Sequence, residues 1–188
     1  AAGFSIDLNT GTTTVLGTGT TFSPVDGGRI EVTGDLTLAS DFTLTSTGPA
    51  MDLSATSVST VSGAGTLINA DSVWVRADVI NVPVVNQGYM RSQESGGSTF
   101  SAAFTNAATG EFILRVFNNA TTVLSSATGI TNAGTITLEG GSTGADYSAT
   151  LSIPNGTLVN TGTIQSLIGS RNGPRILNGN VDNQGTGT

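Results

Sequence analysis

In the segment 71–79, the charged residues Arg76 and Asp78 follow the only tryptophan of the chain, Trp74, at alternate positions. Alternate residues of a β-strand share one face, and an arginine that points into an apolar core without a partner is costly. We therefore expect Trp74, Arg76 and Asp78 to face outward, while the residues at positions 73, 75, 77 and 79 point inward. An indole beside a guanidinium on a protein surface is suited to binding a sugar or a protein partner.

The segment 112–117 has a similar arrangement, because Arg115 stands within an otherwise apolar run. If Arg115 faces outward, Ile113 and Phe117 must share its face. The two segments together predict a ligand or partner surface formed by Trp74, Arg76, Asp78, Ile113, Arg115 and Phe117. The alternative interpretation is that a loop, such as residues 93–101, covers the apolar groups.

Carboxylates and arginines could together form a site that acts on a polysaccharide. Glu139, Asp146 and Asp182 lie in the same part of the chain as the arginines at positions 115, 171 and 175. No two of these acids are within a few residues of one another, and isolated charges on a repetitive β-structure serve to keep it soluble. We therefore expect no catalytic residues, and a polysaccharide lyase or hydrolase is the alternative.

The composition excludes several kinds of chemistry. The 188 residues include no cysteine, histidine or lysine, and the net charge is −7. Disulfides, Ser-His-Asp triads, Schiff-base lysines and ordinary zinc sites are therefore excluded. Six arginines against thirteen acidic residues argue against nucleic acid or an anionic membrane as a partner. No calcium-loop motif is present, so we expect no metal and no cofactor. No apolar run approaches the ~18 residues of a membrane span, so we expect no membrane insertion.

The elements that position these side chains are short β-strands. Valine, isoleucine, phenylalanine and threonine recur along the chain, and these residues favour strands. In the N-terminal half, pairs of apolar residues are separated by one polar residue, and turn signals such as Gly27-Gly28 and Gly48-Pro49 fall between the pairs. This alternation predicts strands with one buried face. The pairs are Ile30/Val32, Leu36/Leu38, Phe42/Leu44 and Met51/Leu53.

A motif built around asparagine recurs in the C-terminal half: an apolar residue, any residue, Asn, any residue, and a small residue or glycine. Its asparagines stand at positions 86, 106, 132, 160 and 183, so that successive copies are spaced unevenly but at comparable intervals. Their mean spacing, about 24 residues, is typical of stacked repeats. Because Asn and Gly adopt left-handed conformations at low cost, the motif predicts a fixed bend between strands. One coil cannot bury its inner face alone, so the coils must stack.

We therefore predict an all-β fold, a parallel β-helix (β-solenoid) of roughly 24-residue coils with variable loops. Residues 28–188 would form the solenoid repeats, and residues 1–27 a cap or partial coil. About eight coils are expected for this length. The alternative fold is a β-sandwich in which the Asn-x-Gly copies are hairpin turns.

Two copies of the motif, Ile-Thr-Asn-Ala-Gly-Thr-Ile at 130–136 and Leu-Val-Asn-Thr-Gly-Thr-Ile at 158–164, resemble repeats of bacterial autotransporter passengers and filamentous-haemagglutinin-like surface proteins. The resemblance covers residues 84–188 by motif and 28–83 by composition. It implies a secreted β-solenoid that adheres, acts as a scaffold or carries variable loops. The C-terminal barrel of autotransporters is not part of this sequence, so we expect a piece of a longer protein.

The function expected from these features is that of a structural or adhesive segment of a larger secreted or surface-attached bacterial protein. It would serve as a stalk, a scaffold or a ligand-displaying solenoid, at the cell surface or outside the cell. Its partners would be neighbouring repeats of the same protein, and a glycan or a cell-surface partner. The alternatives are a polysaccharide-acting β-helix enzyme and a non-catalytic carbohydrate-binding module.

Overall fold

The fold was analysed in a computed structural model of the full chain. It describes residues 5–8, 14–16, 29–45, 50–53, 59–76, 78–93, 97–116, 120–124, 129–140, 146–169 and 172–185. Within these ranges every helix or strand element is a β-strand, and all strand pairs are parallel, as in the pairing of β12 (Tyr89–Gln93) with β15 (Glu111–Val116). The predicted parallel β-solenoid is therefore confirmed, and the sandwich of hairpins is wrong.

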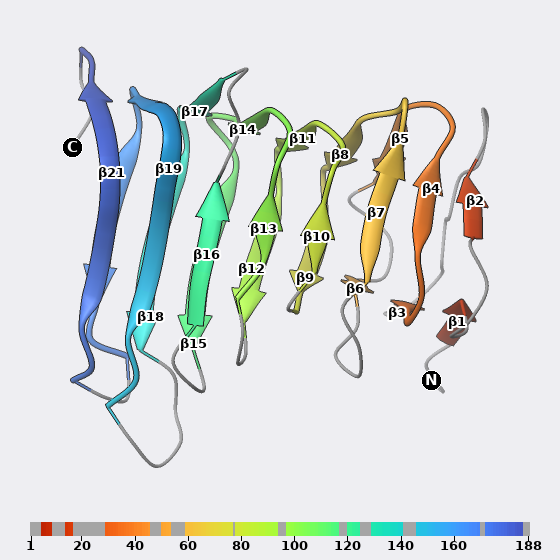
Figure 1. Ribbon diagram of the computed structural model, residues 1–188, viewed down its shortest axis with the longest axis horizontal. Coiled ribbons are helices and arrows are strands. Elements are labelled where there is room, and N and C mark those ends of the chain that lie inside the picture. Colours follow the sequence, from red (N-terminus) through yellow and green to blue (C-terminus); the bar gives the residue numbers. More distant parts are fainter. Residues whose placement is uncertain are drawn as a thin grey trace.

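The strands form three faces that run the length of the molecule (Figure 1). Each coil contributes one strand to the first face, an eight-stranded sheet in the described part of the chain. Its strands in order are β1 (Ser5–Leu8), β3 (Arg29–Val32), β6 (Ala50–Leu53), β9 (Ser72–Val75), β12, β15, β18 (Thr135–Gly140) and β20 (Thr163–Leu167).

The second and third faces are joined through one long strand, β19 (Ala149–Asn160). The second face contains β2 (Thr14–Leu16), β4 (Leu36–Leu38), β7 (Thr60–Gly63), β10 (Val79–Ile80), β13 (Thr99–Phe100), β16 (Ala120–Leu124) and the first part of β19. The third face contains β5 (Phe42–Leu44), β8 (Leu67–Asn69), β11 (Val84–Asn86), β14 (Phe104–Asn106), β17 (Ile130–Asn132) and the last part of β19. The register of β19 with β21 (Arg175–Asn183) shifts between Ile153 and Thr157, where both strands cross from the second face to the third.

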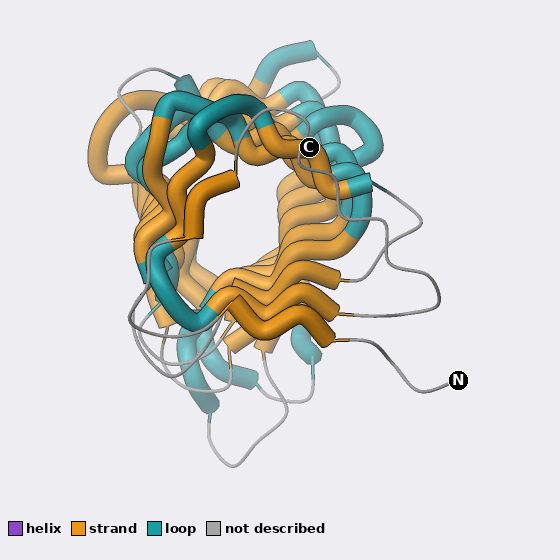
Figure 2. Tube along the Cα trace, turned by 90° about the vertical axis from the view of Figure 1, so that its right-hand side faces the viewer, coloured by secondary structure: helices purple, strands orange, loops and turns teal. Residues whose placement is uncertain are grey.

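The coils have different lengths but stack in one register. On the first face the shortest step runs from Ser72 to Tyr89, and the longest runs from Thr135 to Thr163. Seen along the axis, the strands lie behind one another around a common core, and the connections project outward (Figure 2). The expected period is therefore an average over coils whose extra residues lie between strands. The cap expected for residues 1–27 stays a prediction; β1 and β2 pair in register with β3 and β4.

The core consists of the inward-facing residues of all three faces. The apolar pairs expected in the N-terminal half are buried, with Ile30, Leu36, Leu38, Met51 and Leu53 fully so. Three phenylalanines fill the middle of the solenoid. The ring of Phe104 lies 5.2 Å from that of Phe100 and 4.9 Å from that of Phe112, measured between centroids. A few large side chains are enough to fill this core, because each coil is thin and packs against the coils on both sides.

A column of buried asparagine side chains runs along the axis where the third face ends. The strands β8, β11, β14, β17, β19 and β21 each end at an asparagine, and consecutive asparagines are paired in register. The side-chain Nδ2 of each donates a hydrogen bond to the Oδ1 of the next, with N···O distances of 2.5–2.8 Å. The column, here called the asparagine ladder, consists of Asn69, Asn86, Asn106, Asn132, Asn160 and Asn183.

From Asn69 to Asn160, the second N–H of each amide also finds a backbone acceptor. Asn69 Nδ2 donates to the carbonyl of Tyr89 at 3.0 Å, and Asn86 Nδ2 donates to that of Glu111 at 3.1 Å. The same contact joins Asn132 to the carbonyl of Thr163. Five of the six asparagines are fully buried, all but Asn183. The ladder therefore satisfies amide groups that would otherwise be costly inside the protein, and it links each coil to the next.

The glycine of the Asn-x-Gly motif has a different role from the one expected. Gly88 and Gly162 do not have positive φ angles. A Cβ atom at Gly88 would lie 2.3 Å from the carbonyl oxygen of Asp71 in the preceding coil, and one at Gly162 would lie 2.1 Å from that of Gly134. At these two copies the motif therefore marks a bend where two coils approach too closely for any side chain, and the expected left-handed glycine is wrong there. The last copy differs, because Gly185 has a φ of 58° and a Cβ atom at that glycine would meet no atom within 4 Å.

The first asparagine of the ladder, Asn69, was missed in the sequence. The spacing from Asn69 to Asn86 is shorter than the spacing between any other two consecutive asparagines of the ladder. In addition, Asp71 occupies the place of the motif's glycine. Leu44 is the residue in register with Asn69 in the preceding coil. The ladder therefore starts at Asn69, and an apolar side chain continues the column on its N-terminal side.

We expect Asn106→Ala to destabilise the protein by about 2–4 kcal/mol, because Asn86 Nδ2 loses its acceptor and Asn132 Oδ1 its donor inside the core. Asn106→Leu, which fills the volume with the residue type found at Leu44, should also be destabilising. The control Asn81→Ala alters an exposed asparagine and should change stability by less than about 0.5 kcal/mol. Denaturant midpoints measure all three. Equal midpoints for Asn106→Leu and the wild type would mean that the ladder contributes packing alone.

Candidate ligand-binding surface

The outer face of the first sheet carries most of the candidate site residues. Outward-facing residues of successive strands form a row that is set by the strand register. Asp52 of β6 pairs with Trp74 of β9, Trp74 with Arg91 of β12, and Arg91 with Ile113 of β15. The inward neighbours Val73, Val75 and Met90 are fully buried, so this row points away from the core.

Three arginines in successive coils lie on this face, and an acidic residue flanks them at each end. Arg76 forms an ion pair with Asp52 of the preceding coil, with an N···O distance of 3.0 Å. Arg115 forms an ion pair with Glu139 of the following coil, in which its Nη2 and Nε atoms both donate to Oε2, at 2.7 and 2.8 Å. Arg91 belongs to the coil between those of Arg76 and Arg115. The order along the axis is therefore acid, three arginines, acid.

Trp74 packs against two of these guanidinium groups. The guanidinium carbon of Arg91 lies 4.7 Å from the centroid of the Trp74 ring, and that of Arg76 lies 5.6 Å away. Both distances are those of cation–π interactions. The indole therefore orients the guanidinium groups, which differs from the open sugar-stacking platform suggested by the sequence.

Arg91 is the arginine of this face without an ion pair to a carboxylate within the described residues. It is half-buried, and its Nε atom is buried without a hydrogen-bond partner. Burial lowers the pKa of Arg91, and the neighbouring charges of Arg115 and Arg76 act in the same direction, while Tyr89 opposes them. A positive charge at this position is therefore electrostatically under-compensated.

Arg91 was not among the residues that the sequence suggested. Its strand, Tyr89-Met90-Arg91-Ser92, alternates as expected, with Met90 and Ser92 buried. The missing information was the register, because the coil from Trp74 to Arg91 is shorter than the coil from Arg91 to Ile113. A search for arginines at roughly one coil length from Trp74 could have found it.

Two expectations about this surface are wrong. Asp78 is 1% exposed, because β9 ends at Val75 and the alternation of that strand does not extend to Asp78. Its carboxylate accepts hydrogen bonds from the backbone N–H groups of Arg76 at 2.8 Å and Ser59 at 3.3 Å. For the same reason Val79 is half-buried, and its neighbour Ile80 takes the inward position. Ile113 is on the outer face but only 7% exposed, so it offers no apolar contact area.

The remaining candidates have mixed outcomes. Trp74 is half-buried, and the side chains of Arg76 and Arg115 are 16% and 32% exposed. They lie on the outer side of the first sheet, as expected, and a ligand for them stays a prediction. Ala77 and Phe117 lie outside the described residues.

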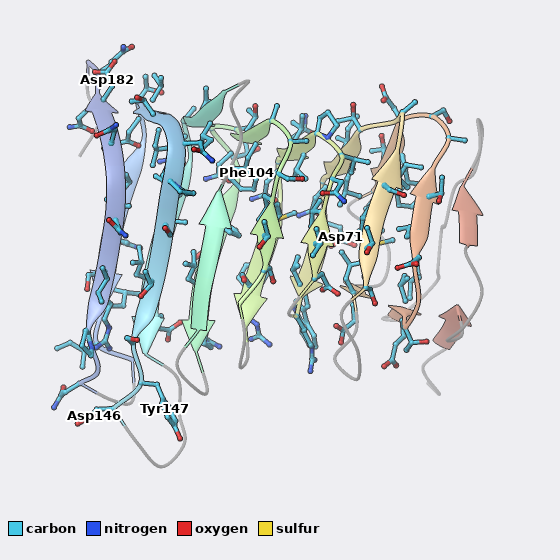
Figure 3. All side chains as sticks on the ribbon, viewed as in Figure 1. Asp71, Phe104, Asp146, Tyr147 and Asp182 are labelled. Carbon is cyan, nitrogen blue, oxygen red and sulfur yellow. The ribbon has the colours of Figure 1, made fainter. Side chains whose placement is uncertain are left out.

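The carboxylates considered for catalysis do not come together. Glu139 pairs with Arg115, whereas Asp182 lies at the upper edge and Asp146 at the lower edge of the molecule in Figure 3. Asp146 accepts a hydrogen bond from the backbone N–H of Asn172, and Asp182 one from the side chain of Gln184. The described residues contain no cluster of three or more acidic residues that could hold a metal ion. No helix long and apolar enough to cross a membrane occurs among them.

The parallel coils and the buried ladder define the chain as a β-solenoid segment. Residues 27–184 match the family described as the BigA fourth domain, so the chain belongs to that family. This match agrees with a surface-associated bacterial protein. No curated protein and no solved structure matches the chain. The more specific resemblance to autotransporter passengers and filamentous haemagglutinins stays a prediction.

The buried Asp78 makes stability depend on pH. Burial raises the pKa of its carboxyl group from 3.8 to about 8, against the opposing effects of the N–H groups of Arg76 and Ser59 and the Arg76 charge. The folded protein then holds a proton that the unfolded chain releases above pH 4. The free energy of unfolding should therefore fall as the pH rises from about 4 to about 8.

We expect Asp78→Asn to remove this decline, since an amide does not titrate. Asp182→Asn, which changes an exposed carboxylate, should keep it. Denaturant unfolding of the wild type, Asp78→Asn and Asp182→Asn at pH 5, 6.5 and 8 gives the slope of the unfolding free energy against pH for each protein. A slope that is identical in the wild type and Asp78→Asn would show that Asp78 is ionised in the folded protein throughout this range.

Proposed function

We propose that this chain is a stiff, non-catalytic spacer within a larger bacterial surface protein, in which neighbouring repeats continue the solenoid. The observation that carries the proposal is the asparagine ladder. It connects six successive coils by buried hydrogen bonds along the direction in which a stalk is loaded. A flexible linker would need no such bonds, because its backbone remains in water.

The C-terminal side of the described solenoid supports stacking onto further coils. Leu177 and Val181 are in register with the fully buried Leu151 and Leu158, yet they are 38% and 37% exposed. Their backbone belongs to β21, which pairs with β19. A further coil would bury these apolar groups and hydrogen-bond to β21, as the preceding coils do for one another. The family's description as a fourth domain also fits a protein of several parts.

Asp146 and Asp182 lie at opposite edges of the molecule in Figure 3, and Glu139 is paired with Arg115. This arrangement favours the structural role over a polysaccharide-acting enzyme, because general acid–base work on a glycosidic bond needs two carboxyl groups on either side of one bond. The stalk is also the simpler of the functions considered, since it needs nothing beyond the geometry of the coils. Adhesion would require a ligand surface in addition.

A spacer must keep a defined length, and this can be measured. The chain lacks cysteine, so Thr43→Cys and Asp182→Cys introduce two unique labelling sites on the exposed side of the third face. Six coil steps separate these positions in register. At ~4.8 Å per step we expect a narrow distance distribution centred near ~29 Å in pulsed electron paramagnetic resonance.

The matched pair Thr43→Cys and Thr131→Cys spans four steps and should give ~19 Å, so that distance scales with the number of coils rather than with residues. Broad distributions that shift with temperature well below unfolding would contradict the proposal, since they are the behaviour of a flexible linker.

A further inference from the structure

The charge arrangement on the first sheet differs from that of the molecule as a whole. The chain has a net charge of −7 and six arginines in total, yet three of them lie on this face in consecutive coils. Two of the three have acidic partners, Asp52 and Glu139, in the coils on the far sides of the group. The centre of the group, at Arg91, is therefore a local positive site within an acidic protein.

Holding like charges side by side on a rigid sheet costs Coulomb energy, which is usually offset by a counter-charge. The coils cannot separate, because the ladder and the backbone hydrogen bonds hold them at strand spacing. The Arg91 Nε atom is buried and makes no hydrogen bond within the described residues. Because Nε is buried, a ligand that approaches from outside can meet only the other N–H groups of this guanidinium, which also hydrogen-bonds the side chain of Tyr89.

We infer that Arg91, held against Trp74, binds the carboxylate of an acidic glycan, with Arg76 and Arg115 on either side adding favourable charge. A planar carboxylate matches the fork of N–H donors that a guanidinium presents. The half-buried Tyr89 lies two residues before Arg91 on the same face and can contact the sugar ring beside the carboxylate. The site is independent of the spacer role, which does not require a ligand.

The flanking acids determine which anions fit. Asp52 and Glu139 bracket the arginines, and Glu111 is exposed next to Tyr89 in the adjacent coil. A polymer with a dense row of charges, such as nucleic acid or a highly sulfated glycan, would place negative groups against these acids. A glycan with one carboxylate per sugar or disaccharide, separated by neutral hydroxyl groups, avoids that repulsion.

Trp74 provides a direct measurement, because it is the only tryptophan and its ring contacts the guanidinium of Arg91. We would titrate the full chain with a galacturonic acid hexamer and follow the tryptophan fluorescence. Cellohexaose is the neutral probe of equal length, and a heparin hexasaccharide and a short single-stranded DNA are the densely charged probes. The inference requires saturable binding of the galacturonic acid hexamer that weakens with salt, and none of cellohexaose.

Variants then assign the binding to this site. Arg91→Gln should weaken binding of the acidic hexamer by about tenfold or more, and Arg91→Lys by less, because it keeps the charge but loses the fork. Arg175→Gln makes the same charge change in β21, at the C-terminal end of the solenoid, where Arg175 donates to the carbonyls of Leu167 and Ile168. This variant should leave affinity unchanged, because Arg91 lies several coils away. Glu139→Gln frees Arg115 from its acidic partner and should strengthen binding by a few fold, an effect that damage to the fold cannot imitate.

Thermal unfolding of each variant confirms that it is folded. The inference is overturned if cellohexaose binds as well as the acidic hexamer, or if Arg91→Gln binds like the wild type. It is also overturned if heparin or DNA binds more tightly than the galacturonic acid hexamer. None of these results would affect the distances measured between Thr43 and Asp182, so the spacer proposal stands or falls separately.

Discussion

The buried asparagine ladder is the interaction on which the other features depend. An amide buried in a protein must find both a donor and an acceptor, and here they come from the coils before and after. A slip of one residue would place Asn106 on the outer face and expose Phe104, so the ladder and the core specify the same register. The ladder also requires glycines beside it, such as Gly88, because the absence of a side chain there lets the coils come within hydrogen-bonding distance.

The outer surface is a product of that register. Trp74, Arg91 and Ile113 belong to no common motif, and they become neighbours because their strands are stacked in order. The binding surface that we propose needs no pocket and no loop, since the sheet itself spaces the side chains at the interval of the strands. The same rigidity makes the charges unable to move apart. A solenoid can therefore present a pattern of charge that a flexible chain would relax.

Local pattern was enough to predict the strands, but relations between coils were not predictable. The pairs Ile30/Val32 and Leu36/Leu38 were identified because their alternation lies within one strand. Asp78 was predicted on the outer face because the alternation was extended beyond Val75, where β9 ends. The recurring asparagines were found in the sequence, but their hydrogen bonds were not predicted. These bonds join different coils, and one copy of the motif does not indicate which residue lies next to it in the following coil. Arg91 was missed for a similar reason: its neighbours depend on coil lengths that vary along the chain.

The variation in coil length has a consequence for how such a protein changes size. Each coil adds one strand spacing to the rod, whether it is the short coil that leads from Ser72 to Tyr89 or the long one from Thr135 to Thr163. The length of the solenoid therefore changes in whole strand spacings, while the lengths of the connections between strands vary freely. Insertions within a connection thicken the molecule without lengthening it. Only the gain or loss of an entire coil, such as residues 89–110, alters its length. The surface chemistry and the length of the solenoid can therefore change in evolution as two separate traits.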